Sequence, residues 1–192
     1  MTEERNLIIK HVFPKLKTLC DSRGVFLSQV DLRWGITTEQ SQSGETINIC
    51  LKEVDRCRPY FVCMLGGRYG WHQPDPINFS ADRQSARNDP LLTKTFLKSC
   101  NEYEWIKGYS DRSITELEVR HAVLNNQNSI TAKKALFYFN ESQESDNVKL
   151  DDLKKEVLKS KLNVKQYLRA EDMAQFLYQD LVSLIDEDFP ET

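Results

Sequence analysis

Two patterns of hydrophobic residues alternate along the chain. Apolar residues recur every three to four positions in residues 3–20, 46–56, 150–158 and 171–186, which predicts helices with one apolar face. A further helix is expected from Ser113, because Ser113 and Glu116 have the spacing of a capping box. Pro14 lies inside the first pattern, and we expect it to kink that helix or to begin a second segment.

Short apolar runs between these segments predict strands at residues 25–32, 60–65, 135–139 and 164–168. The run at 60–65 is continuous, as expected for a strand that is buried on both faces. The alternation of helices and strands predicts an α/β fold, in which helices flank a parallel sheet. We expect residues 1–186 to form a single domain, residues 72–112 to be an insertion rather than a regular element, and residues 187–192 to be a tail or linker.

Composition narrows the classes of function. Hydrophobic residues make up 40% of the 192 residues and charged residues 29%, so a soluble chain with a sizeable core is expected. The formal net charge is -3, which gives no attraction to nucleic acid or to an anionic membrane. No apolar run approaches the roughly 18 residues of a membrane helix. We therefore expect neither nucleic acid nor a membrane as a partner.

The cysteines and histidines do not suggest a metal site. Five cysteines are an odd number in a chain too large to need disulfides, and we expect reduced, mostly buried thiols in a cytoplasmic protein. Cys50 and Cys57 are seven residues apart, and the three histidines have no paired spacing. We expect no metal and no resident cofactor.

Candidate binding residues follow the predicted strands, where open parallel sheets bind ligands. Arg33 could hold a phosphate and Trp34 could stack on a base, although a local ion pair and core packing explain them equally well. Arg68 lies in the glycine-rich segment 66–71, which lacks the spacing of known phosphate loops. We interpret that segment as a turn. Glu116 has a capping role, and Glu118 by pattern alone is best explained as a solvated helix residue.

Several stretches together resemble a known family. They are Val30-Asp31-Leu32-Arg33-Trp34-Gly35-Ile36-Thr37, Cys50-Leu51-x-Glu53-Val54-Asp55-Arg56-Cys57-Arg58-Pro59-Tyr60-Phe61, Leu65-Gly66-x-Arg68-Tyr69-Gly70-Trp71 and Thr115-Glu116-Leu117-Glu118. They resemble the effector-like domain that precedes the NTPase in nephrocystin-type, telomerase-associated and NACHT–WD-repeat proteins, in which tetratricopeptide or WD repeats usually follow. That domain is similar to Toll/interleukin-1 receptor (TIR) domains, which implies a flavodoxin-like parallel sheet in the order 2-1-3-4-5.

The resemblance implies two functions. The first is a signalling and assembly domain that associates with itself or with other proteins. The alternative is a TIR-like NAD+ glycohydrolase, which cleaves the nicotinamide–ribose bond. Glu118-Val119-Arg120-His121-Ala122 matches the catalytic pattern of those enzymes and Glu116 does not, so Glu118 becomes the catalytic candidate. Arg33, Trp34 and Arg68 are then expected to contact NAD+, as substrate rather than cofactor.

One part of the family pattern is missing. Relatives begin with a strand before the first helix, whereas this chain starts at Met1-Thr2-Glu3. That strand lies between the second and third strands of the sheet, and its loss leaves two facing edges unpaired. Either another segment fills the gap, or the neighbouring strands pair directly, or the chain is a truncated product. Unpaired sheet edges are a natural surface for association.

Overall fold

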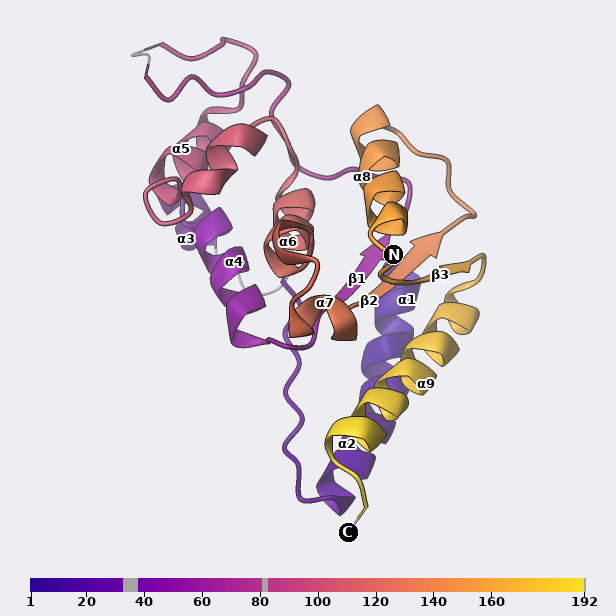
Figure 1. Ribbon diagram of the computed structural model, residues 1–192. Coiled ribbons are helices and arrows are strands. Elements are labelled where there is room, and N and C mark those ends of the chain that lie inside the picture. Colours follow the sequence, from indigo (N-terminus) through magenta and orange to yellow (C-terminus); the bar gives the residue numbers. More distant parts are fainter. Residues whose placement is uncertain (33–37, 81–82, 192) are drawn as a thin grey trace.

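The computed structural model describes residues 1–32, 38–80 and 83–191. Its centre is a parallel sheet of β1 (Val62–Leu65), β2 (Leu136–Asn140) and β3 (Asn163–Tyr167), in that order (Figure 1). Val62 lies opposite Leu136, which in turn lies opposite Asn163. Helices flank the sheet, so the chain has the predicted α/β fold in a flavodoxin-like arrangement.

The predicted helices are present close to their expected positions. The helices of the described residues are α1 (Thr2–Leu7), α2 (Phe13–Ser22), α3 (Thr38–Ser43), α4 (Thr46–Arg56), α5 (Pro90–Ser99), α6 (Ile114–Ala122), α7 (Ile130–Lys134), α8 (Val148–Lys159) and α9 (Ala170–Asp188). Of these, α3, α5 and α7 are additional helices that the sequence pattern did not indicate. A π-helical turn, Ile8–Val12, joins α1 to α2. Pro14 therefore lies at the start of α2, where its missing N–H costs no helix hydrogen bond, and the prediction that it begins a second segment is confirmed.

The sheet separates two hydrophobic cores. Side chains of β2 alternate between them, since Phe137 and Phe139 face one core while Leu136 and Tyr138 face the other. Helices α4, α6, α7 and α8 complete the first core, and α1, α2 and α9 complete the second (Figure 1). This burial on both faces explains why β2 reads as a continuous apolar run.

Residues 72–112 hold regular structure, which corrects our expectation. Asp89 caps α5 by accepting hydrogen bonds from the backbone N–H groups of Leu91 and Leu92, at 2.8 and 3.2 Å, and Pro90 begins the helix. A 3-10 helix follows at Glu104–Tyr109. Apolar side chains of both helices pack against α4 and α6 in a third core. The segment is polar on average, but its few apolar side chains are placed so that they pack into this third core.

Residues 25–32, predicted to be a strand, pair with no described segment, and this prediction is wrong. The segment runs from the end of α2 as a long open thread (Figure 1). Val25 and Leu27 pack on the core of α1, α2 and α9, whereas Leu32 packs on the opposite core. Asp31 forms an ion pair with Arg5 of α1, with 3.2 Å between Oδ2 and Nε. No backbone hydrogen bond of the described residues joins this thread to β1.

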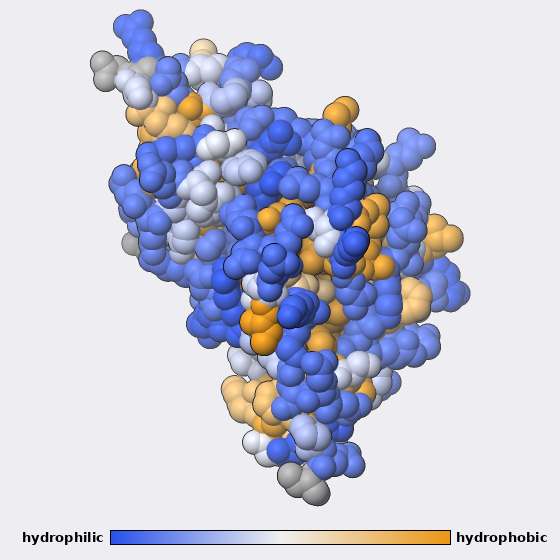
Figure 2. All heavy atoms as spheres, in the orientation of Figure 1, coloured by the Kyte–Doolittle hydropathy of each residue, from blue (hydrophilic) through white to orange (hydrophobic). Residues whose placement is uncertain are grey.

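The visible surface is mostly hydrophilic. Figure 2 shows hydrophobic side chains gathered near the middle of this face, around the position of β1 and β2 in Figure 1, and again near the lower end. None of the helices in the described ranges combines the length and the apolar character needed to cross a membrane. Four of the cysteines are buried as predicted, and Cys57 is partly buried.

Candidate functional site

Glu118 lies on the face of α6 that packs against α4. Its carboxyl group accepts a hydrogen bond from the thiol of Cys50 on α4, and the Asp31 carboxylate is close enough to act on it electrostatically. Burial raises the pKa of the Cys63 thiol on β1, and the nearby charge of Glu118 adds to this rise. The Glu118 carboxyl group therefore lies where α4, α6, β1 and the thread at 25–32 meet, and it is partly buried.

Burial changes the acidity of this group. Removal from water raises the pKa of Glu118 to about 7, the neighbouring Asp31 carboxylate adds to the rise, and the hydrogen bond from Cys50 opposes it. Burial and the Glu118 carboxylate raise the pKa of the Cys50 thiol as well. A carboxyl group whose pKa is near neutral can hold or release a proton at physiological pH, which is the property of a general acid or base.

A second polar group lies on the same side of α4. Thr46 is four residues before Cys50, so the two side chains share one helix face. The Thr46 hydroxyl is buried and has no hydrogen-bond partner among the described residues. A buried hydroxyl with unused bonding capacity is suited to a ligand.

Glu116 has a structural role that only partly matches the capping box. Ser113 Oγ accepts the backbone N–H of Glu116 at 3.2 Å, as predicted. The Glu116 carboxylate accepts hydrogen bonds from Tyr69 and from Arg120 instead of returning to Ser113. The backbone N–H of Ser113 donates to the Tyr69 hydroxyl oxygen at 3.2 Å. Arg120 also contacts Glu156 of α8 at 2.7 Å, so this network ties α6 to two neighbours.

The glycine-rich segment after β1 is a closed turn. Gly67 donates its backbone N–H to Gln143 Oε1 at 3.1 Å, and its carbonyl accepts from the Asp146 N–H at 2.8 Å. Tyr69 donates its backbone N–H to Asp146 Oδ1 at 3.1 Å. A Cβ atom at Gly67 would lie 2.3 Å from the carbonyl oxygen of Glu144, so a glycine is required. These donors are already used, which supports the interpretation as a turn over a phosphate loop.

The other predicted NAD+ contacts are not brought to Glu118 within the described structure. Arg33 and Trp34 lie outside the described residues. Arg68 is exposed just after the turn at Gly67 and makes no hydrogen bond or ion pair with Glu118. The prediction of a shared NAD+ site thus rests on Glu118 and its neighbours.

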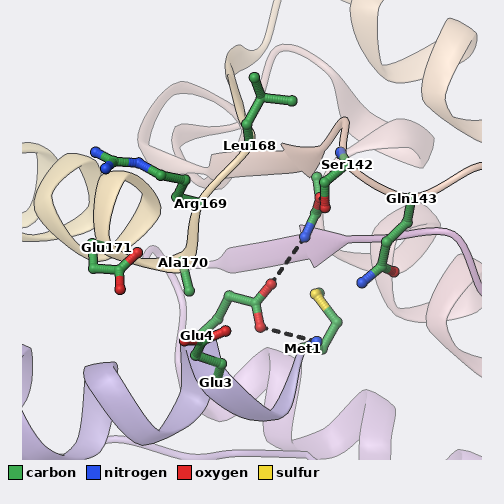
Figure 3. Close-up of a pocket in the computed structure, with 10 residues that line it drawn as sticks. Met1, Glu3, Glu4, Ser142, Gln143, Leu168, Arg169, Ala170 and Glu171 are labelled. Carbon is green, nitrogen blue, oxygen red and sulfur yellow. Dashed lines mark hydrogen bonds and ion pairs between the residues drawn. The ribbon is translucent and has the colours of Figure 1, made fainter.

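A small pocket lies elsewhere, at the carboxyl ends of β2 and β3 (Figure 3). Its volume is about 320 Å³. Glu4 points into it and contacts the Met1 amine at 2.9 Å and Asn140 Nδ2 at 3.1 Å. Burial alone would raise the pKa of Glu4, but hydrogen bonds from Met1 and Tyr167 outweigh it and lower that pKa. The polar groups drawn at its centre are thus satisfied by one another.

The two edges of the sheet differ in character. The backbone N–H of Leu136 donates to the carbonyl of Phe61 at 2.9 Å, so Cys63 and Leu65 also direct their backbone groups toward β2. Val62 and Met64 then direct theirs outward, and no described backbone group pairs with them. β1 carries no charged residue, whereas the opposite edge strand β3 is Asn-Val-Lys-Gln-Tyr. Charge on an edge strand discourages further pairing, so β1 is the less protected edge.

These features define an α/β domain with a parallel sheet, a partly buried carboxyl group whose pKa is about 7, and an apolar edge strand that no described segment pairs. The chain belongs to the family described as "Domain of unknown function (DUF4062)", whose sequence profile matches residues 1–182. This assignment covers nearly all of the chain.

Relatives agree with the resemblance found in the sequence. The chain is 32% identical over 207 residues to a TPR repeat-containing protein of Dictyostelium discoideum, covering 99% of this chain and 12% of that protein. It is 33% identical over 140 residues to Telomerase protein component 1 of Rattus norvegicus, covering 72% of this chain and 5% of that protein. It is 36% identical over 82 residues to NACHT domain- and WD repeat-containing protein 1 of Mus musculus, covering 40% and 5%. The chain thus spans a small part of each relative. No solved structure matches it.

Some residues of these networks were not found from the sequence. The spacing of Glu116 and Arg120, four apart on one helix, could have indicated their ion pair. Tyr69 and Cys50 give no such signal, because each meets α6 only through the tertiary fold.

Proposed function

We propose that this domain is a protein association module whose contact surface is the outer edge of β1. The observation that carries the proposal is the pair of outward-facing backbone positions, Val62 and Met64, which no described backbone group satisfies. The Val62 residue is 39% exposed. A strand added at this edge would gain main-chain hydrogen bonds, as in β-strand addition.

The relatives support a role inside a larger assembly. Their names mention TPR repeats, or a NACHT domain together with WD repeats, and this chain corresponds to only a small part of each. In this proposal the remainder of such a protein would control when copies of the domain meet, and the β1 edge would join them.

The test compares the wild-type domain with Val62→Pro. The Val62 N–H faces away from β2, so the proline removes no bond of the sheet but blocks further pairing. Val62→Ile, which keeps the N–H, is the matched control. Sedimentation over a range of concentrations should show association of the wild type and of Val62→Ile, with loss in Val62→Pro. A wild-type domain that stays monomeric throughout would contradict self-association.

A second candidate function is hydrolysis of NAD+ at its nicotinamide–ribose bond. The observation that favours it is the environment of Glu118, a partly buried carboxyl group with a pKa of about 7. It lies beside the thiol of Cys50, on the face of α4 that also holds the unpartnered hydroxyl of Thr46. In this proposal Glu118, as carboxylate, stabilises the positive charge that develops on the ribose as nicotinamide leaves.

The enzyme candidate is tested by NAD+ consumption at high protein concentration with a crowding agent. Glu118→Ala should abolish turnover, whereas Glu104→Ala should leave it unchanged, because the Glu104 side chain is 86% exposed and pairs with Lys107 rather than with the surroundings of Glu118. Equal turnover by wild type and Glu118→Ala would remove Glu118 from the reaction. Turnover in neither the wild type nor the variants would leave association as the better supported function.

A further inference from the structure

The thread at residues 25–30 has the character of a strand without a partner. Its side chains alternate over residues 25–28, where Val25 and Leu27 are partly buried while Phe26 and Ser28 are exposed. Phe26 is 85% exposed, the most exposed of the large apolar residues described. Beyond the bond from Val25 N–H to the Cys20 carbonyl, no backbone hydrogen bond joins this thread to described residues. Its sequence, Val-Phe-Leu-Ser-Gln-Val, is rich in residues that favour strands.

The same chain also has a sheet edge to which a further strand can be added, the outer edge of β1. Within one copy the two are not paired, since no backbone hydrogen bond of the described residues joins 25–30 to β1. At the start of the thread, Arg23 donates to the carbonyl of Phe189 at 2.8 Å and pairs with Asp186 at 2.5 Å, which holds the end of α2 against α9. At its other end, Asp31 pairs with Arg5. These contacts hold the two ends of the thread in the folded monomer.

We propose that residues 25–30 are a donor strand, which pairs with the β1 edge of a second copy of this chain. This inference rests on the proposed association at β1 and names the partner. The chain itself supplies both halves of the contact, an apolar strand and an apolar edge that have no backbone hydrogen bond to each other or to another strand in the described structure. Exchange between two copies gives both sets of backbone groups partners and covers part of the exposed Phe26 side chain.

The exchange has to break the Arg5–Asp31 ion pair, which is partly exposed, with side chains 19% and 33% accessible, and is therefore screened by water. Gly24, with φ of +67°, precedes the thread and has no atom within 4 Å of a Cβ position, which leaves room for the turn to change direction.

The test uses one variant that cannot donate and one that cannot accept. The donor-blocked variant carries Ser28→Pro together with Gln29→Pro. Consecutive N–H groups point to opposite sides of a strand, so one of the two prolines must face the acceptor. Neither N–H is bonded within the described structure, so the folded monomer should tolerate both changes. Ser28→Thr with Gln29→Thr is the matched control, and Val62→Pro is the acceptor-blocked variant.

Each variant alone should be monomeric in sedimentation, and circular dichroism should show that both keep the wild-type fold. Mixing them should restore a heterodimer, because the Val62→Pro chain still donates and the other chain still accepts. Mass spectrometry of the mixture in native buffer should find one chain of each kind, and the threonine control should associate like the wild type.

Two outcomes would overturn this inference while leaving the proposed function intact. If the donor-blocked variant associates alone as well as the wild type, then β1 pairs with something other than residues 25–30. If both variants are folded monomers and their mixture stays monomeric, strand exchange is not the mode of association. A monomeric wild type is a different result, because it contradicts self-association itself.

Discussion

Two glutamates, two residues apart on α6, have opposite roles. The Glu116 carboxylate is fully buried and accepts hydrogen bonds from Tyr69 and Arg120, so it ties α6 to the turn after β1. Burial is the main reason that the charged form of Glu118 is disfavoured; the nearby Asp31 carboxylate adds to this effect, and the hydrogen bond from Cys50 opposes it. Glu116 is thus a structural contact, whereas Glu118 has a pKa of about 7.

Glu118→Gln should stabilise the domain at alkaline pH. The pKa of Glu118 is raised from 4.5 to about 7 in the folded state, so folding is penalised once the unfolded chain has lost this proton. Stability from this group falls as pH rises from about 4.5 to about 7 and then stays low. The neutral amide avoids the penalty, so the variant should gain up to about 3 kcal/mol at pH 8 and nothing at pH 4.

Urea unfolding at pH 4, 6 and 8 measures this difference. Glu104→Gln, at an exposed position, is the control and should follow the wild type at every pH. A Glu118→Gln variant that is less stable than the wild type at pH 8 would show that the carboxylate has a partner that stabilises its charge.

At the scale of elements, the turn after β1 and the loop after β2 fold as one unit. Gly67 is bonded to the side chain of Gln143 and to the backbone of Asp146, so the carboxyl ends of β1 and β2 are closed by the chain itself. Nucleotide-binding α/β proteins use this region for ligands. Here the donors are already occupied, and the candidate chemistry lies beside α6 instead.

Gly67→Ala should destabilise the domain by about 1–3 kcal/mol, because the added Cβ would lie 2.3 Å from the Glu144 carbonyl oxygen and backbone must move. Gly108→Ala is the matched control, since a Cβ there has no atom within 4 Å. Thermal unfolding should show a clear loss for Gly67→Ala and little change for Gly108→Ala. Equal effects would mean that the loop at 143–146 can move to accommodate the added Cβ at little cost in stability.

At the scale of the whole molecule, the sheet is narrow and its two edge strands differ in their charge and in their protection against further pairing. β2 is covered on both faces and paired on both sides. β3 has Lys165 and Gln166 at its edge, which keep it from further pairing. The outer side of β1 pairs with no strand of the described residues, and the domain is therefore asymmetric in the direction in which it can extend its sheet.

Amide hydrogen exchange should reveal this asymmetry residue by residue. In the monomeric domain the N–H groups of Val62 and Met64 should exchange fast, while those of Cys63 and Leu65, bonded to β2, should exchange slowly. Association should slow Val62 and Met64 and leave Val164 of β3 unchanged. Slow exchange at Val62 and Met64 in the monomer would show that the edge is already paired.

The local pattern of apolar and capping residues predicted most of the helices and strands, because each such pattern lies within a few neighbouring residues. Apolar spacing placed α4 at residues 46–56, the capping serine started α6, and apolar runs located β1, β2 and β3 within two residues of their ends. The same pattern predicted the α/β class, and the motifs indicated the family before any relative was compared. Glu118 was selected by resemblance, and its function as a catalytic group stays a prediction.

Only the tertiary structure decided which distant segments contact one another. Residues 25–32 have the composition of a strand, but a strand also needs a partner in register, and no described segment supplies one. Arg23 and Asp31 instead hold the two ends of this thread against the end of α9 and against α1. The region 72–112 looks polar in sequence because its core contacts, Ile77, Leu92, Phe96 and Ile106, are widely spaced. The pKa of Glu118 likewise depends on Cys50 and Asp31, which are 68 and 87 positions away and meet it only when the chain is folded.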